Sequence, residues 1–273
     1  MLIAGGDGLI AARLGLSMLC LQVSIGAVND VTDVELDRLG KPAKPIPAGM
    51  VSVPLARAWA IGAGALGLAL ASPSGVPAVA VGAAGLALGY LYDLSLSRTV
   101  LSWLPLTLAL PLVPVFAWLG ATGGVPSALV GLVPVALLAG AALTIANGLV
   151  DVERDVRAGK PTIPVRLGRA RAWLVHAALF ALAIAMAFVL APATAASVGG
   201  IGIGGGSGGI GGVVRAVGLP LGTVVIVAGA ALLTAASQGI RERGWELEGV
   251  GTAALGIGWL AGVAALSGGG TGA

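Results

Sequence analysis

Charged residues are scarce in this sequence of 273 residues. Only 10% of the positions are Asp, Glu, Lys or Arg, whereas 57% are hydrophobic, and the mean hydropathy is +1.01. A soluble domain of this length has too much surface to cover with so few charges. The shortage of charge therefore argues against an ordinary soluble enzyme and indicates that lipid surrounds most of the chain.

Cysteine and histidine are nearly absent. The one cysteine, Cys20, has no partner for a disulfide within the chain, and the one histidine, His176, excludes a site built from several histidines of one chain. The formal net charge of +3 would be weak support for nucleic-acid binding in a soluble protein, but in a membrane protein it reports topology. We expect no nucleic-acid partner, and no sequence feature points to an obligate protein partner.

Long apolar runs take the place of charge in this sequence. A helix needs about 20 apolar residues to cross the hydrocarbon core of a bilayer. The sequence predicts an all-α, polytopic transmembrane bundle that forms a single domain over residues 1–273. The eight expected spans are 8–28, 52–71, 76–92, 100–119, 126–150, 169–191, 217–238 and 249–267.

Basic residues collect on one face of this predicted bundle. When the spans are threaded alternately through a bilayer, only Arg13 and Arg215 fall on the other face. The positive-inside rule makes the basic face cytoplasmic, so we expect a multi-pass protein of the cell membrane. The stretch RERGWELEG at 241–249 is predicted to be a solvated loop on that face. The glycine-rich run at 199–212 is predicted to be a flexible connector on the opposite face.

One acidic motif occurs twice, at an offset of 118 residues. Residues 29–37 read NDVTDVELD, and residues 147–155 read NGLVDVERD. Each copy ends an apolar run and precedes a basic, proline-bearing stretch, KPAKPIPAG or GKPTIPVRLG. A single DxxxD beside a loop is ordinarily a solvated helix end. Two matched copies on the same predicted face indicate a shared polar site.

Each copy is expected to line up its polar side chains on one side of a helix, because residues three or four apart share a face. The first stripe consists of Asn29, Asp33 and Asp37, with Asp30 beside it, and the second of Asn147, Asp151 and Asp155. Five carboxylates around one cavity repel one another unless a cation compensates them. Mg²⁺ prefers oxygen ligands and usually binds a few carboxylates together with substrate phosphate. The stripes therefore predict a Mg²⁺–diphosphate site, with nearby Lys and Arg holding phosphate oxygens.

These residues resemble the UbiA superfamily of intramembrane prenyltransferases, whose members carry NDxxDxxxD in the first cytoplasmic loop and a DxxxD motif in a later one. The stretches after both motifs are similar too, and YDLSLSR at 92–98 resembles the family's tyrosine followed by a basic pair. The likeness runs from about residue 10 to the C-terminus. It implies a ring of helices around a central cavity with cytoplasmic catalytic loops. It also implies Mg²⁺-dependent ionisation of an allylic diphosphate, followed by attack of an acceptor on the carbocation.

The resemblance implies a role for each matched residue. Mg²⁺ would be held by Asp30, Asp33, Asp37, Asp151 and Asp155. The catalytic residues would be Asp33, Asp37, Asp151, Asp155 and Tyr92, and the substrate would be bound by Asn29, Asn147, Lys41, Arg98 and Lys160. The expected partners are a prenyl diphosphate donor and a small hydrophobic acceptor, either aromatic or a precursor of a lipid or quinone.

Three features depart from the family pattern. Family members usually have nine spans, and we expect the family's first helix to be missing here. Gly148 stands where the first copy has Asp30, so the second motif has fewer carboxylates. Arg98 stands alone where a basic pair is common.

Other functions stay open at this point. A cyclase of the same family would convert the donor without an acceptor, and a truncated relative would be inactive. A secondary transporter would use the repeat and the acidic residues for ion coupling, but transporter acids typically lie near the bilayer midplane and these lie at span ends. His176, inside a predicted span, is either functional or paired across helices.

Overall fold

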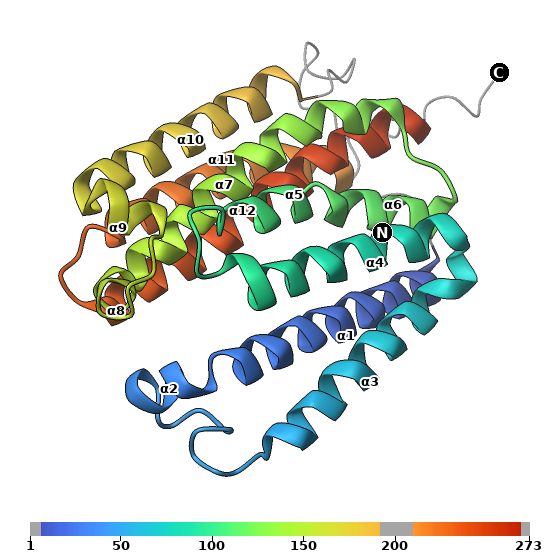
Figure 1. Ribbon diagram of the computed structural model, residues 1–273. Coiled ribbons are helices and arrows are strands. Elements are labelled where there is room, and N and C mark those ends of the chain that lie inside the picture. The colour runs from blue at the N-terminus through green and yellow to red at the C-terminus, as the bar shows by residue number, and fades with distance from the viewer. Residues whose placement is uncertain (1–6, 192–209, 269–273) are drawn as a thin grey trace.

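The computed structural model describes residues 7–191 and 210–268, which form helices joined by turns and packed side by side (Figure 1). The long helices are α1 (Gly8–Thr32), α3 (Val53–Ala71), α4 (Val76–Leu91), α7 (Leu132–Val150), α10 (Arg169–Val189), α11 (Ile210–Leu232) and α12 (Gln238–Gly268). The shorter ones are α2 (Val34–Gly40), α5 (Leu104–Ala109), α6 (Leu112–Thr122), α8 (Val152–Arg157) and α9 (Ile163–Leu167), with single turns at η2 (Ser72–Ser74), η3 (Tyr92–Leu96) and η4 (Ser127–Gly131). The predicted all-α bundle is confirmed.

Six helical segments are long and apolar enough to cross a membrane, so the chain is a multi-pass membrane protein. They are Gly8–Thr32, Val53–Ser74, Val76–Leu96, Leu104–Thr122, Ser127–Val150 and Arg169–Val189. These segments match the first six predicted spans, and α11 adds a shorter apolar segment at Ala216–Leu232. The connector predicted at 199–212 lies outside the described residues as far as 209, and 210–212 already belong to α11.

The prediction of a solvated loop at 241–249 is wrong, because α12 begins at Gln238 and continues through the whole stretch. Glu242, Arg243 and Glu246 are exposed on this helix, whereas Arg241 and Glu248 are buried and lie against partners from other segments. Arg241, which is 1% exposed, donates to the carbonyl of Val150 and forms an ion pair with Glu153. Glu248, which is fully buried, faces His176 on α10. Of the two alternatives left open for His176, a functional role or a partner across helices, the structure shows the partner.

Local signals in the sequence explain where several helices begin and break. The carboxylate of Asp7 accepts from the N–H of Leu9 at 2.8 Å and caps α1. Ser52 caps α3 in the same way through the N–H of Leu55, with a proline in the first turn. Pro111 lies between α5 and α6, where its missing N–H and fixed backbone angle interrupt the helix.

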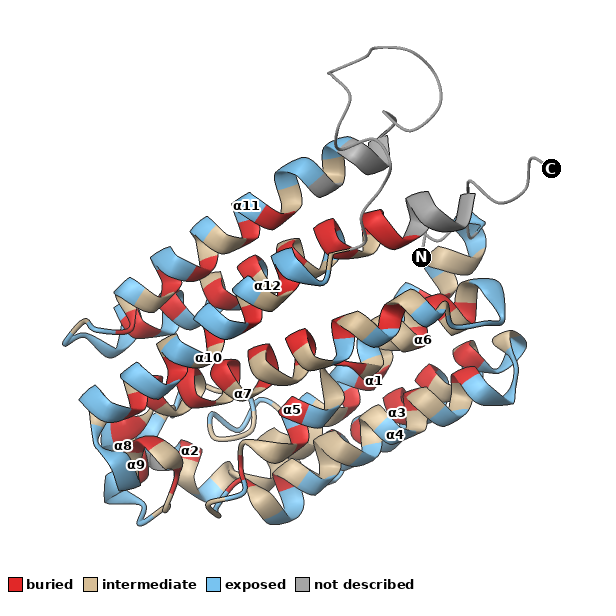
Figure 2. Ribbon diagram, turned by 90° about the horizontal axis from the view of Figure 1, so that it is seen from above, coloured by how far each residue is buried: buried red, intermediate tan, exposed pale blue. Residues whose placement is uncertain are grey.

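Helix α7 forms the centre of the bundle, and buried residues follow most of its length (Figure 2). It contacts α5, α10 and α12. Behind it, α11 and α12 lie with their backbones in contact, since a Cβ atom on Gly222 would meet the backbone nitrogen of Leu255 at 2.6 Å. Small residues at such an interface allow close packing of membrane helices. The end of α7 that carries the second acidic motif is itself buried, with Leu149 and Val150 in one cluster with Ala172 of α10.

Candidate active site

Both acidic motifs lie where a membrane-spanning helix ends and a short helix begins. Asp33 separates α1 from α2 with φ −96° and ψ 9°, and Asp151 separates α7 from α8 with φ −101° and ψ 11°. The N–H of Asp33 donates to the carbonyl of Asn29 at 2.9 Å, and that of Asp151 to Asn147 at 3.3 Å. Each predicted stripe is thus broken at its middle aspartate, near a backbone region in which active-site residues often lie.

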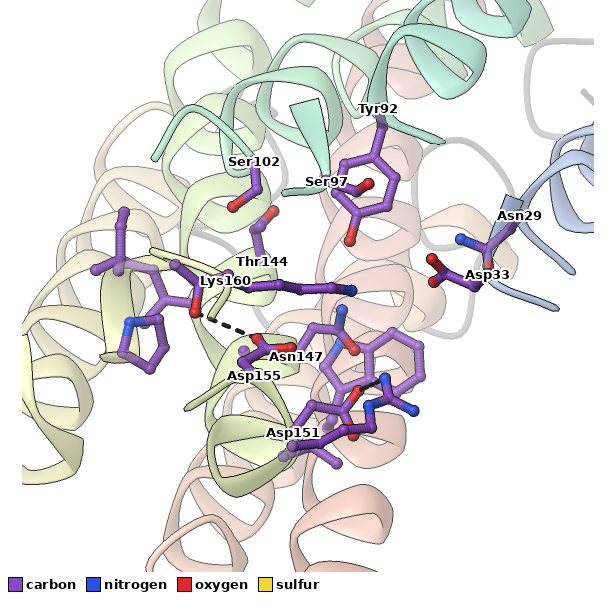
Figure 3. Close-up of a pocket in the computed structure, with 18 of the residues that line it drawn as sticks. Asn29, Asp33, Tyr92, Ser97, Ser102, Thr144, Asn147, Asp151, Asp155 and Lys160 are labelled. Atoms are coloured by element: carbon purple, nitrogen blue, oxygen red, sulfur yellow. Dashed lines mark hydrogen bonds and ion pairs between the residues drawn. The ribbon is translucent and has the colours of Figure 1, made fainter. Parts of the chain in front are cut away.

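One polar cavity of about 280 Å³ brings the two motifs together (Figure 3). The predicted site residues that line it are Asn29, Asp33, Asp37, Lys41, Tyr92, Asn147, Asp151, Asp155 and Lys160. In Figure 3 the first motif approaches from one side and the second from another, and the side chains of Lys160 and Tyr92 point into the space between them. Segments 118 residues apart in the sequence therefore face one cavity.

Two predicted site residues stand outside the wall of this cavity. The Oδ1 atom of Asp30 accepts from the Nζ atom of Lys44 at 2.7 Å. Arg98 is half-exposed, and its Nη2 atom lies 3.3 Å from Oδ1 of Asp33. Both residues therefore touch groups that line the cavity without lining it themselves.

Basic side chains neutralise much of the acidic charge. Lys44 bridges Asp30 at 2.7 Å and Asp37 at 2.6 Å, and Arg154 contacts Asp151 at 2.6 Å. Burial lowers the pKa of Lys44, but the hydrogen bonds and charges of its two carboxylate partners outweigh burial and raise that pKa above its ordinary value of 10.5. Lys44 is therefore an ammonium ion held inside the first motif.

Asp155 has a different environment from the carboxylates that carry ion pairs. It is 5% exposed, and its Oδ2 atom accepts from the hydroxyl of Thr162 at 3.2 Å. Burial raises the pKa of Asp155 above its ordinary value of 3.8, and the charge of Asp151 acts in the same direction. The charge of Lys160 and the hydrogen bond from Thr162 oppose this rise without cancelling it. In the metal-free protein the negative charge of this carboxylate is thus only partly balanced by its surroundings.

The oxygen ligands around the cavity suit a hard divalent cation that shares its coordination with a phosphate. Within 7–191 and 210–268, no group of three or more His, Cys, Asp or Glu side chains is close enough to hold one ion. Mg²⁺ usually takes one or two protein carboxylates and completes its octahedron with water and substrate phosphate. Two pairs, Asp33 with Asp37 and Asp151 with Asp155, line the cavity and fit this pattern.

Asp93 belongs to the site although the sequence reasoning did not single it out. It lies in the π-helical turn η3, is 3% exposed, and accepts from Nδ2 of Asn29 at 2.8 Å. This hydrogen bond fixes the orientation of the first motif's amide. The available signal in the sequence was its position next to Tyr92 in YDLSLSR. The π-helical turn itself agrees with this, because such turns often occur at functional sites.

Helix α12 supplies two further residues of the wall, Glu242 and Trp245. The sequence reasoning missed both because their charged surroundings suggested a loop. Arg241, Trp245 and Glu248 are spaced by four and three residues, which places them on one face of a helix. That spacing was the signal that could have identified the inward face.

An apolar cavity of about 230 Å³ adjoins the polar one. Its walls come from α1, α4, α5 and α6, with Leu21, Ile25, Leu86 and Phe116 among the lining side chains. The two cavities share Tyr92, Thr144, Asn147 and Trp245 as common walls. An apolar chamber thus begins at the level of the acidic motifs.

A further apolar cavity, of about 490 Å³, is lined by residues of α6, α7 and α12. Val113 forms part of the wall of this cavity and of the 230 Å³ cavity. The helices therefore surround two neighbouring apolar spaces, of which the smaller shares a boundary with the acidic site.

The family model described as the UbiA prenyltransferase family matches residues 1–243 of this chain. A digeranylgeranylglyceryl phosphate synthase of Methanopyrus kandleri is 35% identical over 160 residues, which cover 59% of this chain and 58% of that protein. The enzyme of the same name from Pyrococcus abyssi is 29% identical over 182 residues, which cover 65% of each chain. The chain thus spans less than two thirds of the length of these curated relatives.

Solved structures show the same fold. A UbiA homologue from Aeropyrum pernix superimposes with a TM-score of 0.72 over 94% of this chain and 91% of the other, at 21% identity. A UbiA homologue from Archaeoglobus fulgidus, bound to GPP and Mg²⁺, superimposes with a TM-score of 0.66 over 97% of this chain and 90% of the other, at 20% identity.

Proposed function

We propose a function from one premise: the chain belongs to the UbiA prenyltransferase family. It transfers a prenyl group from an allylic prenyl diphosphate, held with Mg²⁺, to an acceptor within the membrane. The proposal is carried by the junction of a polar and an apolar cavity at Tyr92, Thr144, Asn147 and Trp245. A prenyl diphosphate has the same division into a charged head and an apolar tail.

The junction is where the reacting bond would lie. With the diphosphate in the polar cavity and the prenyl chain in the apolar one, the bond between C1 of the prenyl group and the diphosphate oxygen falls beside Tyr92 and Trp245. When this bond breaks, its electron pair leaves with the diphosphate. A nucleophilic atom of the acceptor then bonds to C1 and releases its proton to solvent.

Some residues of the site would bind the diphosphate head of the donor, and others would face its prenyl group. Asp33, Asp37, Asp151 and Asp155 would hold the metal, and Lys41 and Lys160 would donate to the diphosphate oxygens. Bound Mg²⁺ would offset the negative charge that develops on the leaving diphosphate. The aromatic faces of Tyr92 and Trp245 would attract the positive charge that develops at C1.

The relatives named digeranylgeranylglyceryl phosphate synthases guide the choice of acceptor. Their name describes a glyceryl phosphate with two geranylgeranyl chains, so a glyceryl phosphate that already carries one such chain is the acceptor to test first. The 490 Å³ apolar cavity beyond Val113 offers space for the acceptor's own chain beside the donor's. An aromatic acceptor is the second candidate.

The orientation in the membrane is part of the proposal. The segments that follow the two acidic motifs carry Lys41, Lys44, Arg157 and Lys160. Positive residues are retained on the cytoplasmic side during insertion. The polar cavity therefore opens to the cytoplasm, where a soluble or membrane-adsorbed prenyl diphosphate is accessible.

Thermal unfolding of the detergent-purified chain tests the donor site without knowledge of the acceptor. The ligand is a non-hydrolysable geranylgeranyl diphosphate analogue, with either Mg²⁺ or EDTA. At a hundred times its Kd, the analogue stabilises the fold by about 2.7 kcal/mol. Asp33→Asn and Asp151→Asn should abolish the Mg²⁺-dependent shift, because each removes a carboxylate from one motif.

Glu35→Gln is the matched control. Glu35 lies on the same short helix as Asp37 but is exposed, and its only ion pair among the described residues is with Arg38. Its substitution should leave the shift intact. Absence of any shift in the wild-type chain would overturn the proposal. Conversion of donor alone to a hydrocarbon or alcohol, with no gain when acceptor is added, would identify a cyclase instead.

A further inference from the structure

Lys44 occupies the carboxylates of the first motif. Its Nζ atom lies 2.7 Å from Oδ1 of Asp30 and 2.6 Å from Oδ2 of Asp37. The Asp37 side chain is only 5% exposed, and Lys44 lines the same polar cavity. The ammonium therefore fills a position on Asp37 that a metal ion would otherwise take.

The second motif has a neutral side chain at the equivalent position. Thr162 follows Asp155 by the same seven residues that separate Lys44 from Asp37. Its hydroxyl donates to Oδ2 of Asp155 at 3.2 Å. Among the residues that the structure describes, Asp155 forms no ion pair within 4.0 Å. The two halves of the repeat thus share their geometry and differ in charge at this point.

This difference sets the order in which the two halves can take a cation. Asp151 in the second motif is paired with Arg154 at 2.6 Å, so Asp155 is the carboxylate of that motif at which a cation breaks no ion pair. A cation that approaches Asp37 must first displace Lys44, because two cations on one carboxylate repel each other. A phosphate group removes this obstacle, since an ammonium is a compact donor that binds phosphate oxygens well.

The backbone around Lys44 allows such a transfer. The N–H of Lys44 donates to the carbonyl of Lys41 at 3.0 Å, and the carbonyl of Lys44 accepts from the N–H of Ala48 at 2.9 Å. The backbone is therefore fixed on both sides, while the flexible four-carbon side chain allows the ammonium to move within the cavity once its two ion pairs break.

We propose that Lys44 makes metal binding at the first motif depend on the diphosphate donor, while the second motif binds metal without it. This inference rests on the proposed function. Lys44 acts as a positioning residue: it holds Asp30 and Asp37 until the donor arrives, then moves to the diphosphate and leaves Asp37 free for the metal. Metal binding in the absence of donor is thereby prevented at the first motif but not at the second.

The test is a Mn²⁺ titration of the detergent-purified full chain, followed by electron paramagnetic resonance, with and without the non-hydrolysable donor analogue. Mn²⁺ takes the same oxygen ligands as Mg²⁺. In the wild-type chain the analogue should tighten Mn²⁺ binding by a factor of about 5 to 150, the usual range for coupled sites. Lys44→Thr, which copies the second motif, should bind Mn²⁺ about fivefold more tightly without the analogue and show less coupling.

Two further variants keep the result decisive. Lys44→Arg keeps the charge and should retain weak donor-free binding, as the wild-type chain does. Lys41→Thr removes a lysine that lines the cavity but forms no ion pair in the described part of the chain. It should weaken the analogue without tightening Mn²⁺ in its absence.

Unchanged or weaker donor-free Mn²⁺ binding in Lys44→Thr, with normal unfolding behaviour, would overturn the role of Lys44. Equal tightening by Lys41→Thr would overturn it as well, because net charge alone would then explain the effect. If the wild-type chain binds no analogue at all, the proposed function fails. The donor-free comparison of wild type with Lys44→Thr still tests the competition in that case.

Discussion

The Nε2 atom of His176 on α10 lies 2.9 Å from Oε1 of Glu248 on α12, and both side chains are completely buried. The contact has the distance of a hydrogen bond but lacks its alignment. It lies one helical turn from Trp245, which lines both the polar and the smaller apolar cavity. The pair therefore fixes the rotation of the helix that carries Trp245.

Breaking this pair on one side should cost more than removing it altogether. His176→Leu or Glu248→Met alone leaves a buried polar group without its partner, and we expect a loss of about 3–5 kcal/mol in the free energy of unfolding. The double variant His176→Leu/Glu248→Met should lose less than the sum of the two single variants. Unfolding of the purified chain in increasing denaturant measures this, and strictly additive losses would contradict the coupling.

We expect the carboxylate of Asp155 to lower the stability of the metal-free protein at neutral pH while it serves in metal binding. Since folding raises its pKa, the carboxyl group contributes stability that is fully present below its ordinary pKa of 3.8 and is lost as the pH rises through the folded-state pKa. At pH 7 in EDTA, Asp155→Asn should therefore melt about 2 °C or more above the wild type. The same variant should lose the Mg²⁺-dependent shift with the donor analogue.

The control for Asp155 is again Glu35→Gln, whose carboxylate is exposed. It should change neither the melting temperature in EDTA nor the ligand-induced shift. The difference between Asp155→Asn and the wild type should shrink as the pH approaches 4, because the wild-type carboxyl then becomes protonated. A constant difference from pH 7 to pH 4 would show that charge is not the cause.

Packing against Pro164 explains why the second motif has Gly148 where the first motif has Asp30. A Cβ atom at Gly148 would lie 2.9 Å from Cγ and 3.1 Å from Cδ of Pro164, a rigid ring in α9. Restoring the first motif's pattern with Gly148→Asp should therefore cost about 1–3 kcal/mol of stability, as overpacking does. It should not strengthen Mn²⁺ binding.

Gly148→Ala separates the two causes, because alanine adds the same Cβ atom without a carboxylate. Both variants should melt below the wild type by similar amounts. Tighter Mn²⁺ binding by Gly148→Asp at unchanged stability would show that the second motif has room for a further ligand and that packing does not explain the glycine.

Much of the site could be predicted from the sequence because the repeat is local and its spacing is regular. Asn29, Asp33 and Asp37 recur 118 residues later, and both copies line one cavity. The position of Lys44 could not be predicted in the same way, although it lies in the same proline-bearing stretch as Lys41. Which of the two lysines reaches Asp37 depends on the turn after α2, which no spacing rule fixes.

The first third of α12 shows why charge misleads in a membrane protein. Arg241 and Glu248 were assigned to water because they are charged, but each has a partner on another helix, Glu153 or His176. Such pairing is a tertiary property, invisible in any window of the sequence. The apolar chamber was likewise beyond prediction, because its walls come from five separate segments of the chain.

The depth of the 230 Å³ chamber should set the length of the prenyl chain that the protein accepts. Gly85 on α4 lines this chamber, and a Cβ atom there would meet nothing within 4 Å. Gly85→Leu should therefore fold normally and fill part of the space. We expect weaker binding of a geranylgeranyl diphosphate analogue by a factor of about 10 or more, and little change for a dimethylallyl analogue, because each excluded methylene loses about 0.8 kcal/mol of burial. Gly26→Leu is the matched control, since Gly26 is also a helical glycine with open space around its Cβ position, but it is exposed and lines none of the cavities described above. Equal weakening of both analogues by Gly85→Leu would place the prenyl chain elsewhere, with the larger cavity beyond Val113 as the next to be tested.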